Sequence, residues 1–202
     1  MTKPNLKFEQ KLWQKGYKHV AGVDEAGRGP LAGPVVAASV ILPTNMSFLG
    51  INDSKKLTQK RREELYGWIF GYAVVGVRVI SNETIDEINI LNATKKAMVE
   101  AVENMVIVRP DCLLIDGPIT LLTKIDQEYI IKGDEKSMSI AAASIIAKVT
   151  RDYIMEDLHE LFPMYGWDTN KGYGTRKHRD AIQKYGPTAF HRMSFKGVGR
   201  GA

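Results

Sequence analysis

Four acidic residues stand where the chain leaves an expected strand or enters an expected helix. Asp24 and Glu25 directly follow an apolar segment, and Asp116 closes the apolar run 112–115. Asp134 follows a glycine just ahead of the longest helical pattern in the chain. Carboxylate oxygens are the hard ligands that Mg²⁺ and Mn²⁺ prefer. The four acids together therefore predict a divalent-metal site, and metal-assisted phosphodiester cleavage is the chemistry that such a site favours.

Each acid also has an ordinary structural explanation when it is judged alone. An Asp-Glu pair such as Asp24-Glu25 suits a solvated turn, and Asp134 suits a helix N-cap or the first turn of a helix. Neighbouring side chains in a strand point to opposite faces, so the chain must bend for Asp24 and Glu25 to reach one metal ion. Ala26-Gly27 permits such a bend. Metal binding is favoured because acids recur at three separate places.

Other chemistries have weaker support in the sequence. The single cysteine, Cys112, and four scattered histidines offer no cluster for zinc. Glycines 27, 29 and 33 have the wrong spacing for the dinucleotide fingerprint GxGxxG, and the phosphate-loop pattern GxxxxGK[ST] does not occur. We therefore expect no nucleotide cofactor.

Periodicity predicts the elements that must position the acids. Strands are expected at 19–23, 34–42, 72–80, 112–115 and, weakly, 129–131. Helices are expected at 58–70, 89–105, 137–162 and 175–185, with Thr58 and Asn89 as N-caps. Strands come first and then alternate with helices, which predicts an α/β fold with a partly antiparallel sheet. The Ala-rich start of the longest helix predicts that another backbone packs closely against it.

Composition predicts one soluble domain over residues 1–202, with a helical and loop extension from about 163 to 202. The formal net charge is +5, and setting the four acids aside leaves 28 basic against 19 acidic residues, which favours a polyanionic partner. One cysteine, a polar amino terminus and no apolar run of ~20 residues predict a cytoplasmic protein without a membrane span.

Six ordered motifs resemble the ribonuclease HII family in sequence and spacing. They are Gly22–Val35, Asp53–Leu57, Ile115–Gly117, Lys132–Asp134, Ala141–Lys148 and Gly172–Thr175. The resemblance implies a ribonuclease H-like fold, with a mixed five-stranded sheet flanked by helices and a small C-terminal helical extension. It also implies that Asp24, Glu25, Asp116 and Asp134 are the catalytic carboxylates that bind Mn²⁺ or Mg²⁺, with metal-activated water as the nucleophile.

The same resemblance implies which residues bind the substrate. Gly27-Arg28-Gly29 would approach the ribose 2′-hydroxyl, and Tyr173 would pack on the next sugar at an RNA-to-DNA junction. Candidates for backbone phosphates, which position a duplex without reading its sequence, are Lys55, Ser137, Ser144 and Lys148. The histidines of the C-terminal pattern, His178 and His191, either bind phosphate or pack, and no histidine is assigned to catalysis.

The implied activity is that of a monomeric endoribonuclease. It would cut the RNA strand of RNA/DNA hybrids and nick ribonucleotide-containing duplex DNA on the 5′ side of the ribonucleotide, leaving 3′-hydroxyl and 5′-phosphate ends. Ribonuclease HIII is disfavoured because it has Lys at the position of Arg28. A binding-only module predicts a broken carboxylate position and a transposase predicts long DNA-binding appendages; the sequence shows neither.

Overall fold

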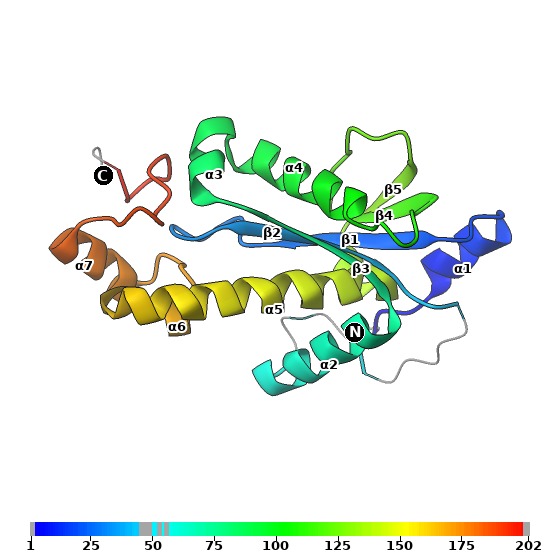
Figure 1. Ribbon diagram of the computed structural model, residues 1–202, viewed down its shortest axis with the longest axis horizontal. Coiled ribbons are helices and arrows are strands. Elements are labelled where there is room, and N and C mark those ends of the chain that lie inside the picture. The colour runs from blue at the N-terminus through cyan, green and yellow to red at the C-terminus, as the bar shows by residue number, and fades with distance from the viewer. Residues whose placement is uncertain (1–2, 45–49, 52–53, 55–56, 200–202) are drawn as a thin grey trace.

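The computed structural model describes residues 3–44, 50–51, 54 and 57–199, which form an α/β fold around one five-stranded sheet (Figure 1). The strands lie in the order β3-β2-β1-β4-β5, and β1 pairs antiparallel with β2 and parallel with β4. Their bounds are β1 Val20–Ala26, β2 Val35–Ile41, β3 Val74–Ile80, β4 Cys112–Asp116 and β5 Asp126–Ile130. The predicted mixed sheet is confirmed, with β5 beginning three residues before the expected strand 129–131 and ending one residue before its end.

Helices cover both faces of the sheet. The α-helices are α1 Lys7–Gln14, α2 Gln59–Tyr72, α3 Asn82–Ile88, α4 Ile90–Glu103, α5 Met138–Leu161, α6 Trp167–Asn170 and α7 Arg176–Tyr185, and the 3₁₀ helices are η2 Gly133–Glu135 and η3 Pro163–Tyr165. The predicted caps are confirmed, because Thr58 and Asn89 each accept a main-chain N–H of the first turn. The sequence prediction missed α1 and α3, which are short and bury few apolar residues.

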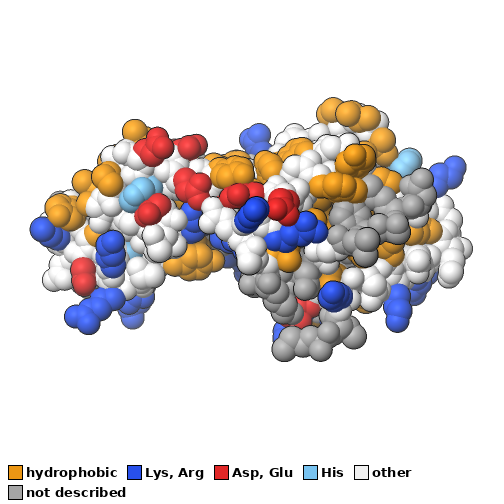
Figure 2. Space-filling model, turned by 90° about the horizontal axis from the view of Figure 1, so that it is seen from below, with side chains coloured by type: hydrophobic (Ala, Val, Ile, Leu, Met, Phe, Trp, Pro, Cys, Tyr) orange, Lys and Arg blue, Asp and Glu red, His pale blue; other side chains and the backbone are white. Residues whose placement is uncertain are grey.

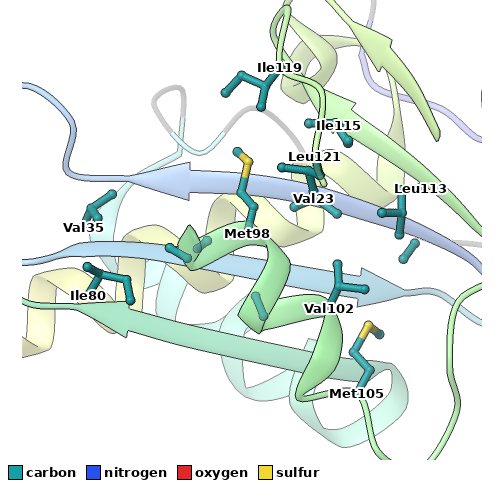
Figure 3. Packing of buried hydrophobic residues seen from close by; sticks show 14 of the residues in the cluster. Val23, Val35, Ile80, Met98, Val102, Met105, Leu113, Ile115, Ile119 and Leu121 are labelled. Carbon is teal, nitrogen blue, oxygen red and sulfur yellow. The ribbon is translucent and has the colours of Figure 1, made fainter. Parts of the chain in front are cut away.

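The first layer of the core lies between the sheet and α4. Apolar residues at helical spacing in α4, such as Met98 and Val102, face the side chains that alternate inward from the strands, such as Val23 and Ile115 (Figure 3). Burial of this face fixes the register of β1, because a shift of its pairing by one residue would move every buried side chain to the opposite face of the sheet.

The second layer packs α5 much closer to the sheet. Alanines 141–143 and 147 are fully buried against β2 and its neighbours. A Cβ placed on Gly22 of β1 would lie 2.1 Å from the main-chain carbon of Ser139 in α5. The predicted close approach of a second backbone to the Ala-rich start of this helix is therefore confirmed.

The C-terminal segment packs on the far end of α5 (Figure 1). Its short helices η3, α6 and α7 bury Tyr165 and Trp167 against Leu31 and Met155, and so join this segment to the loop that follows β1. In the described part of the chain, no helix is both long and apolar enough to cross a membrane.

Candidate active site

The parallel pairing of β1 with β4 brings two of the predicted acids together. Val23 pairs with Ile115, so Asp24 and Asp116 follow at the same level of two adjacent strands, which lie about 4.8 Å apart in a sheet. Asp24 is 5% exposed, and the side chain of Asp116 accepts the main-chain N–H of Gly133 at 2.6 Å. Both carboxylates are thus fixed at the carboxyl end of the strands, where open α/β sheets hold their ligands.

Glu25 reaches the same site although the strand does not bend between it and Asp24. β1 remains paired with β2 through Ala26, and the turn comes one residue later, at Gly27, whose φ is +99°. The Glu25 carboxylate is held by Arg28 at 3.3 Å, and its side chain is only 11% exposed. The two neighbouring acids therefore belong to one site although they lie in a regular strand.

Asp134 lies in the 3₁₀ turn that precedes α5 and is 4% exposed. Its neighbour Gly133 donates to Asp116, and a Cβ on Gly133 would meet both Ile140 and the Asp116 carboxylate. This close approach places the turn beside β4. The structure thus brings the third predicted position, residue 134, next to Asp116.

Crowded carboxylates make the site electrostatically unfavourable as it stands. Burial, followed by the charges of Glu25 and Asp116, raises the pKa of Asp24 well above its usual value, although a hydrogen bond from Ser144 acts in the opposite direction. Burial also raises the pKa of Glu25, and the charge of Arg28 opposes that shift. The Oε2 atom of Glu25 is buried without a hydrogen-bond partner among the described residues.

These features fit a bound cation. A divalent ion would satisfy the orphaned oxygen and offset the burial and the repulsion between carboxylates that raise the two pKa values. Within the described residues, no three His, Cys, Asp or Glu side chains converge closely enough to enclose an ion by themselves. Oxygens from substrate and water would therefore have to complete the coordination.

A cavity of about 250 Å³ connects the carboxylates to the predicted substrate-binding loops. It is lined by Asp24, Glu25, Asp116, residues 26–29, Ser54, Ser144, Lys148, Arg151 and Tyr173. The Tyr173 ring lies across Gly29, where a Cβ would stand 3.5 Å from its Cε1 atom. A larger hollow of about 530 Å³ lies between α4 and residues 121–125, but none of the four predicted acids lines it.

Only some of the residues predicted to bind phosphate line the cavity. Ser144 and Lys148 lie one turn apart on α5 and line the cavity, but Lys148 is already paired with Asp152 at 2.5 Å. Ser137 lies outside the cavity wall: it is fully buried, caps α5 and donates to Glu9 at 2.6 Å. This hydroxyl is therefore engaged in an interior network that phosphate does not reach. Lys55 lies outside the described residues.

Two buried arginines hold the glycine-rich loop from behind, and the sequence prediction did not single them out. Arg192 donates to the carbonyls of Gly27 at 2.6 Å, Arg28 at 3.1 Å and Gly33 at 3.0 Å. Arg151 donates to the carbonyls of Ala32 and Pro34 in the same loop. Arg151 stands seven residues after Ser144 and three after Lys148, on the same helix face, so helical spacing from these two candidates could have found it. No comparable signal exists for Arg192.

Lysine and arginine side chains are spread over the surface around α2 and α5. Figure 2 views the molecule from this side, and the basic side chains reach both ends and are interspersed with Asp and Glu. Among the exposed basic side chains are Arg61 in α2 and Arg176 in α7. This distribution suits contacts with a long polyanion, because such contacts are made at many separated points.

The fold and the carboxylate cluster define the class of protein: an α/β protein with a ribonuclease H-like fold and an acidic site at the carboxyl ends of its strands. The model of the family "Ribonuclease HII" matches residues 21–198. The chain belongs to the ribonuclease HII family. It is thus an enzyme that hydrolyses the RNA of RNA/DNA hybrids, as the sequence prediction stated.

Curated relatives and solved structures agree with this assignment. The chain is 56% identical to ribonuclease HII of Acetivibrio thermocellus over 93% of its own length and 73% of the relative. It is also 56% identical to ribonuclease HII of Syntrophus aciditrophicus, over 94% of this chain and 89% of the relative.

Among solved structures, ribonuclease HII in the PCNA complex of Archaeoglobus fulgidus is 31% identical with a TM-score of 0.75, covering 89% of this chain and 96% of that one. Ribonuclease H2 of Pyrococcus horikoshii is 28% identical with a TM-score of 0.76, covering 90% and 95%. The predicted ribonuclease H-like fold is confirmed.

Proposed function

We propose that the enzyme nicks duplex DNA on the 5′ side of an embedded ribonucleotide and leaves 3′-hydroxyl and 5′-phosphate ends. The observation that carries this proposal is the shared cavity, which joins the carboxylates Asp24, Glu25 and Asp116 to the loop 27–29 and to Tyr173. A scissile phosphate at the acids would leave its ribose beside the glycines and the next sugar beside the tyrosine. The enzyme would thereby remove ribonucleotides from DNA.

Dependence on a divalent metal is a property of the ribonuclease H group; for this chain we propose Mn²⁺ or Mg²⁺, held by Asp24, Glu25, Asp116 and Asp134. A solved structure of a ribonuclease HIII that shares the fold is a complex with Mn²⁺. When bound, such an ion lowers the pKa of water and stabilises the charge that develops on the phosphate oxygens. The chain's own contribution is to hold the carboxylates ready, and the main-chain N–H of Gly133 fixes Asp116 for this purpose.

Main-chain groups of the loop 27–29 are proposed to recognise the ribose. Gly29 is exposed and Gly27 has a positive φ, so the loop can approach a sugar at a distance that a side chain would block. Only the 2′-hydroxyl separates RNA from DNA at a given sugar, and main-chain groups can donate to it or accept from it. Ser144 and Lys148 line the same cavity and are proposed to contact the neighbouring phosphates.

The test is cleavage of a DNA duplex that contains one ribonucleotide, with Mg²⁺ or Mn²⁺, followed by analysis of both new ends. An all-DNA duplex must remain intact. Asp116→Asn is expected to lose most activity, because an amide is a poor ligand for a hard cation, while the exposed Asp157→Asn in α5 retains it. Intact ribonucleotide substrate, or full activity of Asp116→Asn, would refute the proposal.

Junction recognition by Tyr173 has its own experiment. The ring is 48% exposed and stands against Gly29, so it is free to stack on a sugar. Tyr173→Ala is expected to lower cleavage at a single embedded ribonucleotide more than cleavage of a continuous RNA/DNA hybrid. Equal losses on both substrates would contradict the role of the ring at the junction.

We further propose that the protein works as a monomer in the cytoplasm. The buried, unpaired thiol of Cys112 suits a reducing compartment. Light scattering on a size-exclusion column tests the monomer, and a dimer mass at micromolar concentration would overturn it.

A further inference from the structure

Two histidines of the C-terminal segment lie side by side in the protein interior. His178 in α7 is fully buried, His191 is 1% exposed, and their Nε2 atoms are 3.2 Å apart. Trp167 donates to Nε2 of His178 at 3.0 Å, and the Tyr165 ring packs on His191 with centroids 4.9 Å apart. Neither histidine lines the active-site cavity, so neither touches a substrate bound there.

Their hydrogen-bond partners fix where each ring carries its proton. The carbonyl of Tyr173 can only accept, so Nδ1 of His178, 2.9 Å away, donates to it. The main-chain N–H of Thr188 can only donate, so Nδ1 of His191 accepts at 2.9 Å and the proton of this ring stands on Nε2. His191 therefore donates to Nε2 of His178, whose single lone pair it shares with the N–H of Trp167. Two neutral rings thus form a chain of hydrogen bonds that ends on the main chain of Tyr173.

The neutral state of both rings agrees with their surroundings. Burial lowers the pKa of His178, and burial together with the nearby His178 ring lowers the pKa of His191 to about 4. Both rings are thus uncharged near neutral pH, as the hydrogen-bond chain requires.

The main chain around Tyr173 depends on such support. Lys171 and Gly172, which precede it, have positive φ values of 49° and 83°, a conformation that is unfavourable for lysine. The Tyr173 carbonyl accepts from His178 and from the N–H of Thr175 at 2.8 Å. The exposed ring projects from this turn, so the path of the main chain determines where the ring stands above Gly29.

We propose that His178, held in its tautomer by His191, is a positioning residue that sets the place of the Tyr173 ring at the junction sugar. The inference rests on the proposed role of Tyr173. Without the Nδ1 donor, the Tyr173 carbonyl loses one of its two partners and the turn can rotate, which carries the ring away from the sugar. Cleavage that relies on a single junction then falls more than cleavage of a continuous hybrid.

The experiment measures the ratio of kcat/KM on a duplex with one ribonucleotide to kcat/KM on a continuous hybrid. His178→Ala is expected to lower this ratio about fivefold, which corresponds to about 1 kcal/mol, the size of one buried hydrogen bond. His178→Asn is expected to restore most of the ratio, because its amide can donate close to the position of Nδ1. Tyr165→Phe, which removes a part-buried hydrogen bond to Gly186 in the same cluster, lowers thermal stability and leaves the ratio unchanged.

Two further variants separate the possible failures. In the double variant Tyr173→Ala/His178→Ala, the ratio is expected to equal that of Tyr173→Ala alone, because both changes act on one ring. If Tyr173→Ala lowers the ratio but folded His178→Ala keeps the native ratio, the positioning role of His178 is refuted and the junction role of Tyr173 stands. A native ratio in Tyr173→Ala overturns the proposed junction role itself. If His178→Ala does not fold, His191→Leu breaks the same chain one link earlier, and a native ratio there overturns the inference.

Discussion

Replacing Gly22 with alanine tests whether the close packing of β1 on α5 sets the active site. The new Cβ would lie 2.1 Å from the Ser139 carbon, 2.2 Å from the Ile140 nitrogen and 2.4 Å from the Ser139 oxygen, where ordinary contacts begin at 3.4 Å. All three atoms belong to the main chain of α5, so no side-chain rotation can relieve the overlap. Strand and helix must separate by roughly 1 Å, as the shortfall against ordinary packing requires.

The size of the effect follows from this separation. Overpacking of a core costs about 1–3 kcal/mol when side chains can adjust, and the rigid neighbour here places Gly22→Ala at the upper end. For a chain of this length, about 3 kcal/mol lowers Tm by roughly 6–12 °C. Asp24 is two residues away, and Ser144 of α5 hydrogen-bonds to it, so a shift of about 1 Å is expected to reduce kcat on the order of a hundredfold.

Circular dichroism during heating measures the change in Tm, and cleavage of an RNA/DNA hybrid well below Tm measures the change in kcat. Gly67→Ala is the matched control: Gly67 lies inside α2 with open space around the built Cβ. There alanine is expected to stabilise the protein by up to about 1 kcal/mol through helix propensity and to leave cleavage unchanged. A Gly22→Ala protein with native Tm and native kcat would refute the packing argument.

Three further predictions concern buried charge. Asp24→Asn is expected to abolish cleavage but to raise the free energy of unfolding of the metal-free protein by on the order of 1 kcal/mol. The reason is that burial and neighbouring charges raise the pKa of the Asp24 carboxyl, so its charged form is unfavourable in the folded protein; a lower Tm would contradict this. Because the folded pKa of His191, about 4, lies below the ordinary histidine pKa of 6.5, the unfolded state gains its proton first as pH falls. Up to about 3 kcal/mol of stability is therefore lost between pH 6.5 and 4, measured by urea unfolding, and His191→Gln should flatten that slope. Arg192→Lys is expected to lower the free energy of unfolding by at least about 2 kcal/mol, because a single ammonium cannot reach four carbonyls. An unchanged free energy of unfolding in urea would disprove that.

Local pattern was sufficient to predict the sheet and the long helices. The strand that became β1 begins as a short apolar run, β2 is rich in β-branched residues, and α4 carries a regular apolar stripe with an Asn cap. Because strand ends were visible, the placement of Asp24 and Asp116 could be predicted as well. The helices α1 and α3 were missed because each buries only two residues, too few for a periodic signal.

Tertiary contacts decided what the sequence could not. Ser137 and Ser144 stand seven residues apart on one helical pattern, but Ser137 faces Glu9 of α1, a helix that was not predicted, while Ser144 faces the cavity. Arg192 lies 165 positions from Gly27, one of the residues it binds. Such pairings depend on how distant segments fold together, and periodicity within a window of a dozen residues carries no information about them.

Arg151 and Arg192 bind main-chain oxygens of the loop 27–34, so exposed side chains of this loop can be changed without losing these contacts. A guanidinium that binds carbonyls does not distinguish one residue type from another, so these contacts hold the path of the loop whatever side chain projects from an exposed position. Gly27 and Gly33 are exceptions, because both have positive φ and a Cβ on either would clash with its neighbours. The side chain of Arg28 is 48% exposed and takes no part in that anchorage, although its carbonyl does. A library of side chains at this position would therefore vary the cavity wall and the ion pair with Glu25 while the main chain stays in place.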